Sequence, residues 1–315
     1  MPAPTAPKII AICGAGQMGA AAAVSFQRAG YRTLLWARNP QKLPAIRQTV
    51  TALDGWLRQH VGPPARATGH LEVVSDLGLL DEQADLVMDC IAEVLAEKVA
   101  LFRALPRTQA RPAIFLTTTS GLSITDLGRQ SGTGPRLVGT HFWNPPHLMP
   151  LVEVIRGQDT TAEVVEQVLE VVRSIDKIPV RVNQDVPGFI GNRLLHALWR
   201  EAINLVQRGI ASPADVDRVA RLTFGLRLPA VGPLENMDLV GLDLVQTIHQ
   251  YLLADLSNSP APLPLLNDQV QQGQLGMKSG HGFYDWQTRD PKALIERRDR
   301  QIVHQLAWLK QQDAL

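Results

Sequence analysis

Residues 8–13, Lys-Ile-Ile-Ala-Ile-Cys, lead directly into residues 14–19, Gly-Ala-Gly-Gln-Met-Gly. The first stretch is short and apolar, which predicts a buried strand, and the second carries three glycines at a spacing typical of dinucleotide-binding turns. The Ala-rich stretch that ends at Ala29 predicts a helix, and residues 31–36 predict a second strand. Strand, glycine turn, helix and strand within about 30 residues predict a βαβ unit of the Rossmann type.

Five residues of the glycine turn have a physical role in this interpretation. Gly14 permits the tight turn, Gly16 lets the backbone approach a pyrophosphate, and Gly19 lets the helix pack closely on the strand. Gln17 and Met18 begin the helix, where free N–H groups and a partial positive charge attract phosphate. An ordinary turn is the alternative, but the flanking strands and helix favour cofactor binding by these five residues.

Strand candidates at residues 71–75, 86–91 and 114–118 alternate with helical segments, and this alternation predicts a parallel sheet covered on both faces. A chain of 315 residues is about twice the size of an average domain. Beyond about residue 185 the pattern becomes helical. We therefore predict an α/β protein with an N-terminal Rossmann domain and a doubly wound sheet over residues 1–185. An all-helical domain for substrate binding and dimerisation would follow over residues 186–315.

Charge and composition exclude several classes of protein. Lys and Arg number 31 and Asp and Glu 30, so the net charge of +1 gives no field to hold a nucleic acid. No apolar run suits a membrane span, and no His, Cys and acidic residues have the spacing of metal ligands. The two cysteines, Cys13 and Cys90, cannot form a disulfide framework, which favours a reducing, cytoplasmic location.

A histidine and a carboxylate stand out in residues 141–154. His-Phe-Trp-Asn-Pro-Pro occupies 141–146, and Leu-Val-Glu-Val occupies 151–154. A histidine suits proton transfer to or from an alcohol, because its pKa lies near the working pH. Glu153, in an otherwise apolar run, would fix the tautomer of that ring. A structural histidine is the alternative, but beside a nucleotide-binding turn we favour an acid–base role for His141.

The end of the second predicted strand bears on the choice of cofactor. NAD enzymes usually place Asp or Glu there to bind the ribose 2′-hydroxyl, whereas this chain has Trp-Ala-Arg-Asn at residues 36–39. Arg38 can bind a 2′-phosphate that an acidic residue would repel. The alternative is that Arg38 is a solvated loop residue in an NAD enzyme. We favour NADP slightly over NAD.

The sequence resembles the 3-hydroxyacyl-CoA dehydrogenase family over nearly the whole chain. The matching motifs are the glycine turn, Glu93 with Lys98, Thr119-Ser120, His141-Phe-Trp-Asn-Pro, Glu153, Asp185-Val-Pro-Gly-Phe-Ile-Gly-Asn192-Arg193, Gly232-Pro233 and Gly276-Met-Lys-Ser-Gly-His-Gly-Phe-Tyr284. The resemblance implies hydride transfer between a nicotinamide and a secondary alcohol. It also implies a helical C-terminal domain that commonly forms a homodimer.

The resemblance also implies roles for single residues. His141 would be the general base for alcohol oxidation and the acid in reverse, and Glu153 would orient it. Ser120 and Asn192 would surround the reacting oxygen; since Asn192 begins the helical domain, the site would lie between the domains. The implied cofactor contacts outside the glycine turn are Glu93, Lys98 and Asn144.

Two departures from the family pattern concern the substrate. Thr118 stands where an Asn is common, and residues 43–61 form a short helical segment without a lysine cluster. Members that act on fatty acyl-CoA hold the CoA phosphates with a longer, basic helical arm. We therefore expect a small hydroxy acid or secondary alcohol without CoA, as in the branch of L-gulonate, carnitine and pyridoxine-degradation dehydrogenases. A short-chain 3-hydroxyacyl-CoA dehydrogenase and a non-catalytic protein of the lambda-crystallin type are the alternatives.

Overall fold

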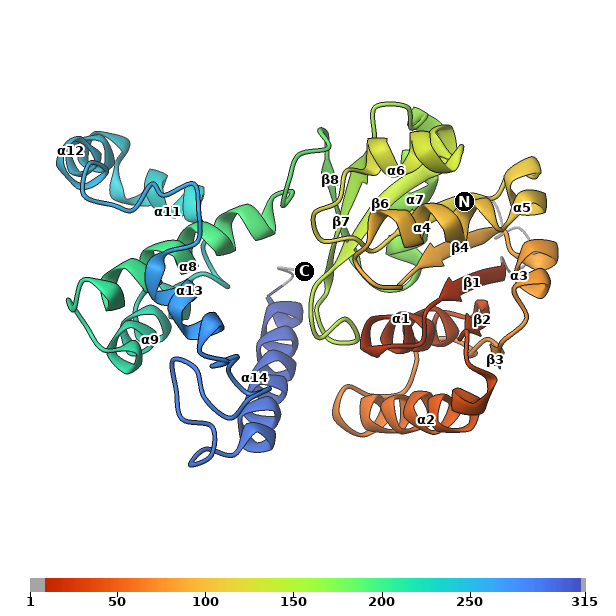
Figure 1. Ribbon diagram of the computed structural model, residues 1–315, viewed down its shortest axis with the longest axis horizontal. Coiled ribbons are helices and arrows are strands. Elements are labelled where there is room, and N and C mark those ends of the chain that lie inside the picture. The colour runs from red at the N-terminus through yellow and green to blue at the C-terminus, as the bar shows by residue number, and fades with distance from the viewer. Residues whose placement is uncertain (1–8, 313–315) are drawn as a thin grey trace. The chain divides into compact units, whose positions relative to one another are not determined.

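The computed structural model describes residues 9–312, which form two compact units. The first ends at Asn192, and the second begins at Arg193. In the first unit an eight-stranded sheet runs in the order β3-β2-β1-β4-β5-β6-β7-β8, with helices packed against it (Figure 1). The strands are β1 (Ile9–Cys13), β2 (Arg32–Trp36), β3 (Leu71–Val74), β4 (Leu86–Asp89), β5 (Ile114–Thr117), β6 (Leu137–Phe142), β7 (Leu151–Arg156) and β8 (Ile178–Val182).

The pairing of these strands confirms the Rossmann prediction. Strand β1 pairs in parallel with β2 and with β4, and β3, β5 and β6 extend the parallel sheet on either side. The one departure among residues 9–192 is the antiparallel pair of β6 and β7. A loop rather than a crossover helix joins these two strands, and an antiparallel neighbour is the arrangement that such a connection allows.

The helices of the first unit follow from helix propensity and capping. In α1 the run Ala20–Ala23 is at most 2% exposed, because small side chains let this helix lie close to the sheet. Ser123 and Thr161 cap their helices by accepting backbone N–H bonds. The bounds are α1 (Gln17–Arg28), η1 (Pro40–Lys42), α2 (Leu43–His60), α3 (Leu77–Gln83), α4 (Leu95–Arg103), α5 (Pro106–Ala110), α6 (Ile124–Ser131), η2 (Gly134–Arg136) and α7 (Ala162–Ser174).

The second unit is helical, as the sequence predicts. Its first helix, α8, begins at Gly191 and continues through the end of the first unit. The helices are α8 (Gly191–Gln207), α9 (Pro213–Leu222), α10 (Phe224–Arg227), α11 (Pro233–Val240), α12 (Leu242–Leu252), α13 (Pro264–Gln271) and α14 (Pro291–Gln311). No residue in these seven helices is buried.

The hydrophobic core lies in the first unit. Ile10, Ile12, Leu34 and Val87 are fully buried on the central strands, as expected for a sheet covered on both faces. Within residues 9–312, no helix is long and apolar enough to cross a membrane. The same residues contain no group of three or more His, Cys, Asp or Glu side chains placed to hold a metal ion.

Candidate active site

The glycine turn between β1 and α1 leaves space for a ligand. A Cβ at Gly14 would lie 2.6 Å from the carbonyl oxygen of Cys90, and Gly14 has a φ of +111°, so both space and backbone conformation require glycine. A Cβ at Gly19 would lie 1.8 Å from the oxygen of Gly14. Around Gly16, by contrast, an added Cβ would meet nothing within 4 Å. Gly16 also caps α1 without a side-chain acceptor, so the helix N-terminus can receive a phosphate.

His141 and Glu153 lie directly opposite each other on the antiparallel strands β6 and β7. The Nδ1 atom of His141 lies 2.6 Å from Oε2 of Glu153, and the two residues are 4% and 2% exposed. Burial acts to raise the pKa of Glu153, but the hydrogen bonds from His141, Gly191 and Ile190 outweigh burial and lower that pKa. Glu153 is therefore a carboxylate at neutral pH.

The second oxygen of Glu153 accepts two backbone bonds from the segment that leads into α8. The N–H groups of Ile190 and Gly191 donate to Oε1 at 2.9 and 3.0 Å. A Cβ at residue 191 would lie 2.1 Å from the ring of Trp143, so only glycine fits there. Phe189, just before, has a φ of +50° and packs against the His141 ring at 5.7 Å between centroids. This segment fixes the carboxylate that faces His141.

Ser120 and Asn192 are joined by a hydrogen bond from the Asn192 side chain to the Ser120 carbonyl oxygen, at 3.1 Å. The Ser120 N–H donates to Oε1 of Glu93 at 2.8 Å, and the Thr119 hydroxyl donates to the same oxygen. Because Gly191 precedes Asn192, one short segment contacts both Glu153 and Ser120. The structure thus brings together His141, Glu153, Ser120 and Asn192.

The predicted cofactor residues outside the glycine turn lie in different environments. Asn144 accepts a bond from the Gln17 side chain at 3.2 Å, which links the loop after β6 to the start of α1. Arg38 is exposed beyond β2. Glu93 lies beside Ser120, whereas Lys98 is 1% exposed and pairs with the buried carboxylate of Asp89.

The model of the 3-hydroxyacyl-CoA dehydrogenase NAD-binding domain matches residues 9–186, and that of the C-terminal domain matches residues 188–286. The chain belongs to the 3-hydroxyacyl-CoA dehydrogenase family. It is accordingly an oxidoreductase that acts on a CH–OH group with a nicotinamide cofactor, as the motifs predict.

Relatives in this family differ in their substrates. The chain is 33% identical to 5-formyl-3-hydroxy-2-methylpyridine 4-carboxylate 5-dehydrogenase of Mesorhizobium japonicum, over 93% of this chain and 96% of that protein. It is 35% identical to a probable 3-hydroxybutyryl-CoA dehydrogenase of Bacillus subtilis, over 90% and 98%. A crystal structure of a 5-formyl-3-hydroxy-2-methylpyridine 4-carboxylic acid 5-dehydrogenase, described as an NAD⁺-dependent dismutase, superposes on this chain with a TM-score of 0.90. The two sequences are 32% identical, and the superposition covers 97% of this chain and 99% of that chain.

Several residues support the site through contacts that the sequence does not predict. Gly191 and Trp143 belong to family motifs, but their contact depends on how the start of α8 meets the loop after β6. Asp89 lies inside the strand predicted over residues 86–91, and the sequence indicated no further role for it. A charged residue after an apolar run was the available signal, but its partner Lys98 is nine residues away and on a helix.

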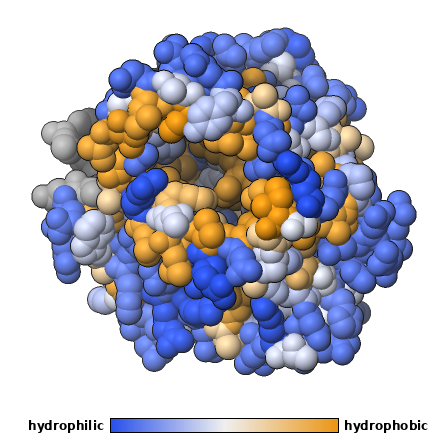
Figure 2. Space-filling view, turned by 90° about the vertical axis from the view of Figure 1, so that its left-hand side faces the viewer, coloured by the Kyte–Doolittle hydropathy of each residue, from blue (hydrophilic) through white to orange (hydrophobic). Residues whose placement is uncertain are grey.

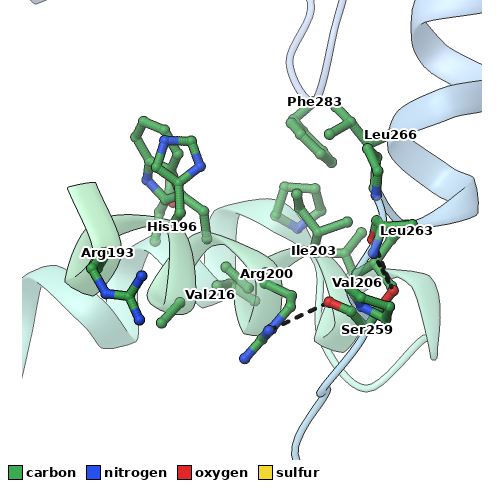
Figure 3. Close-up of a pocket in the computed structure, with 18 of the residues that line it drawn as sticks. Arg193, His196, Arg200, Ile203, Val206, Val216, Ser259, Leu263, Leu266 and Phe283 are labelled. Carbon is green, nitrogen blue, oxygen red and sulfur yellow. Dashed lines mark hydrogen bonds between the residues drawn. The ribbon is translucent and has the colours of Figure 1, made fainter. Parts of the chain in front are cut away.

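The helical unit contains a separate cavity of about 990 Å³. Arg193, His196 and Arg200 of α8 border it, together with Phe283 and other apolar side chains (Figure 3). The Arg200 guanidinium donates to the Ser259 carbonyl oxygen at 3.4 Å. The walls of this cavity are mostly apolar, unlike the hydrogen-bonded surroundings of His141.

Proposed function

We propose that the chain transfers hydride between a nicotinamide and a small hydroxy acid, or a related alcohol, that carries no CoA. The observation that carries the hydride transfer is the buried hydrogen bond between His141 Nδ1 and the ionised Glu153. A carboxylate accepts hydrogen bonds and cannot donate them, so the neutral ring carries its proton on Nδ1. The Nε2 atom then has the lone pair that a general base requires.

In the oxidation direction, Nε2 of His141 takes the proton of the substrate hydroxyl while the hydrogen on the carbinol carbon leaves as hydride. The nicotinamide, when bound, supplies the acceptor for that hydride. The positive charge that forms on His141 is stabilised by Glu153, which two backbone N–H groups hold in place. In reverse, the same nitrogen returns the proton to the carbonyl oxygen.

Ser120 and Asn192 would position the reacting oxygen. The Ser120 backbone is held at both ends, by Glu93 at its N–H and by Asn192 at its carbonyl oxygen. Its hydroxyl is left to donate to the substrate oxygen as negative charge develops there. A donor that is already oriented stabilises such charge more than solvent does.

Helix α2 supports a substrate without CoA. Its cationic side chains already have partners: Arg58 pairs with Asp54 at 2.7 Å, and Arg47 donates to the Val73 carbonyl oxygen at 3.1 Å. The indole of Trp56 packs edge-on against His147, with 5.7 Å between centroids. Side chains held in this way, on a helix without lysine, are less free to turn toward the phosphates of CoA. The relative named for a pyridine carboxylate agrees with a small acid as substrate.

The end of β2 favours NADP over NAD. Residues 37–42, Ala-Arg-Asn-Pro-Gln-Lys, contain no carboxylate to bind a 2′-hydroxyl, and Arg38 and Lys42 are both exposed. Two cations beside the ribose would attract a 2′-phosphate. The related crystal structure is described as NAD⁺-dependent, so the two cofactors need a direct comparison.

The test is a reduction assay with NADH and NADPH on a panel of small oxo acids and aromatic aldehydes, with acetoacetyl-CoA as the competing class. We expect kcat/KM for the best CoA-free substrate to exceed that for acetoacetyl-CoA by at least ~100-fold, about 2.7 kcal/mol. NADPH should bind at least as tightly as NADH. A preference for acetoacetyl-CoA would assign the CoA reaction instead. Cofactor binding without turnover of any substrate would favour a structural protein of the lambda-crystallin type.

The helical unit would form the interface of a homodimer. Leu226, Leu234, Leu239 and Tyr251 are between 67% and 76% exposed. Figure 2 shows apolar residues gathered around a hollow. Apolar surface of this extent is typical of a surface that another chain covers. A second copy of the chain is the partner that the family resemblance implies.

A further inference from the structure

A buried ion pair lies beneath the residues that hold Ser120. Asp89 ends β4 and is fully buried, and Lys98 of α4 is 1% exposed. The Lys98 ammonium donates to the Asp89 carboxylate. The backbone of Asp89 lies between Cys13, which precedes the glycine turn, and Thr117, which precedes the Ser120 turn. The pair therefore sits where the ends of three strands meet.

Lys98 also faces a second carboxylate. Its Nζ atom lies 3.6 Å from Oε2 of Glu93, whose side chain is 46% exposed. Glu93 thus uses its two oxygens differently: Oε2 faces the ammonium, and Oε1 accepts from the Thr119 hydroxyl and the Ser120 N–H. The position of the ammonium consequently limits how the Glu93 carboxylate can turn.

The turn after β5 depends on that carboxylate. The Thr119 hydroxyl donates to Glu93 and accepts the Leu122 N–H at 2.9 Å. The Thr118 hydroxyl donates to the Asp89 carbonyl oxygen at 2.9 Å, so β4 contacts this turn through its backbone as well. A rotation of the Glu93 carboxylate would break two bonds at Thr119 and Ser120 together.

We propose that Asp89 is a positioning residue for the reaction, acting through Lys98 and Glu93 on Ser120. Asp89 fixes the ammonium of Lys98, the ammonium fixes Glu93, and Glu93 orients the turn that presents the Ser120 hydroxyl. This inference rests on the proposed role of Ser120.

The charge of Asp89 matters because the ion pair is buried. Burial raises the pKa of Asp89 above its usual range, although the Lys98 ammonium acts in the opposite direction. Without the carboxylate, Lys98 would be a buried cation with Glu93 as its nearest acid. We expect the ammonium to move toward Glu93 and to draw the carboxylate away from Thr119 and Ser120, since a buried charge needs a partner.

The central experiment is a double-mutant cycle with Asp89→Asn and Glu93→Gln, assayed at saturating cofactor. We expect Asp89→Asn to lower kcat about tenfold and to change the KM of the carbonyl substrate less than about twofold. If Asp89 acts through Glu93, the same substitution in the Glu93→Gln background should have little further effect. Equal losses in both backgrounds would overturn the proposal.

Asp89→Asn leaves a buried charge unpaired and can impair folding, so a second variant is needed. Asp89→Leu with Lys98→Met replaces the pair by apolar side chains, an exchange that other proteins tolerate. We expect this variant to fold and to show at least the tenfold loss of kcat. Full activity in a folded double variant would contradict the proposal.

Two further variants separate this proposal from a general loss of stability and from the role of Ser120. Asp81 is another buried carboxylate of the same unit, bound to the backbone of Arg107 and Thr108. Asp81→Asn should lower the melting temperature and leave kcat unchanged. If Ser120→Ala is fully active, the role of Ser120 is wrong. If Ser120→Ala is impaired and Asp89→Asn is not, only the coupling through Asp89 is wrong.

Discussion

The two units of this protein place their apolar side chains in opposite ways. In residues 9–192 the central strands β1, β4, β5 and β6 are almost entirely buried, and Asp89, His141 and Glu153 are buried with hydrogen-bonding partners. In residues 193–312 no helix buries a residue, and large apolar side chains face outward. The first unit has a hydrophobic core of its own, whereas the second exposes apolar surface of the kind that a partner chain often covers.

From this contrast we expect the chemistry and the proposed assembly to depend on different units. The bonds among His141, Glu153, Ser120 and Asn192 all lie within the first unit, so their geometry is set by β6, β7 and the start of α8. The second unit supplies a mostly apolar cavity and an apolar surface. Substitutions in the two units should therefore affect different properties of the protein.

The largest effect is expected for assembly. Leu234→Glu with Leu239→Glu places two charges on α11, where these side chains are 74% and 76% exposed. Each buried Leu contributes ~1.5–3 kcal/mol, and a charge left in an apolar interface adds a further cost. We expect the dimer dissociation constant to rise by at least ~1,000-fold, about 4 kcal/mol, measured by sedimentation equilibrium.

The matched control for assembly is Val61→Glu. Val61 is an apolar residue of the first unit and is 50% exposed. This variant should remain dimeric. A wild-type protein that is monomeric at micromolar concentration, or a double variant that stays dimeric, would show that the helical unit is not the interface.

A smaller effect, on turnover alone, is expected in the first unit. His141→Ala removes the base, and Glu153→Gln offers an amide N–H to Nδ1, which moves the ring proton to Nε2. Each should lower kcat by at least ~100-fold, about 2.7 kcal/mol. Stopped-flow measurement of hydride transfer checks this effect, with His70→Ala, an exposed histidine of the same unit, as the control. Folded variants of both residues with near-normal turnover would remove His141 from the mechanism.

The sequence predicted the parts of this fold that depend on local pattern. The glycine turn, the strands near residues 9, 32, 71, 86 and 114, and the helical second half all have strong periodicity or turn chemistry. The strand pair β6–β7 was not predicted, and its antiparallel register follows from the loop between the strands rather than from the strands themselves. That register is what places His141 opposite Glu153.

Contacts between distant segments could not be predicted in the same way. The backbone of Ile190 and Gly191 holds Glu153, and Trp143 leaves space for glycine alone at residue 191. Backbone donors cannot be recognised in the sequence, since every residue except proline supplies an N–H group. The glycines of residues 188–191 were a signal of close approach, but not of which side chain approaches.

The smallest effect concerns a buried cation of the first unit. Lys177 is 8% exposed, and its ammonium donates to the Met149 carbonyl oxygen at 2.7 Å. Burial lowers the pKa of Lys177 from 10.5 to about 8. Between those values the unfolded chain binds more protons, so this group makes the free energy of unfolding rise with pH from about 8 to 10.5.

Lys177→Met should therefore stabilise the protein at neutral pH and lose that advantage in alkali. A lowering from 10.5 to about 8 corresponds to ~3 kcal/mol at pH 7, and the loss of the bond to Met149 offsets ~2 kcal/mol, which leaves a gain of about 1 kcal/mol. By pH 10 the variant should be less stable than the wild type. Urea unfolding at several pH values measures this crossover, and Lys42→Met, on an exposed lysine of the same unit, should show none. A stability difference that does not vary with pH would mean that Lys177 titrates alike in the folded and unfolded chains.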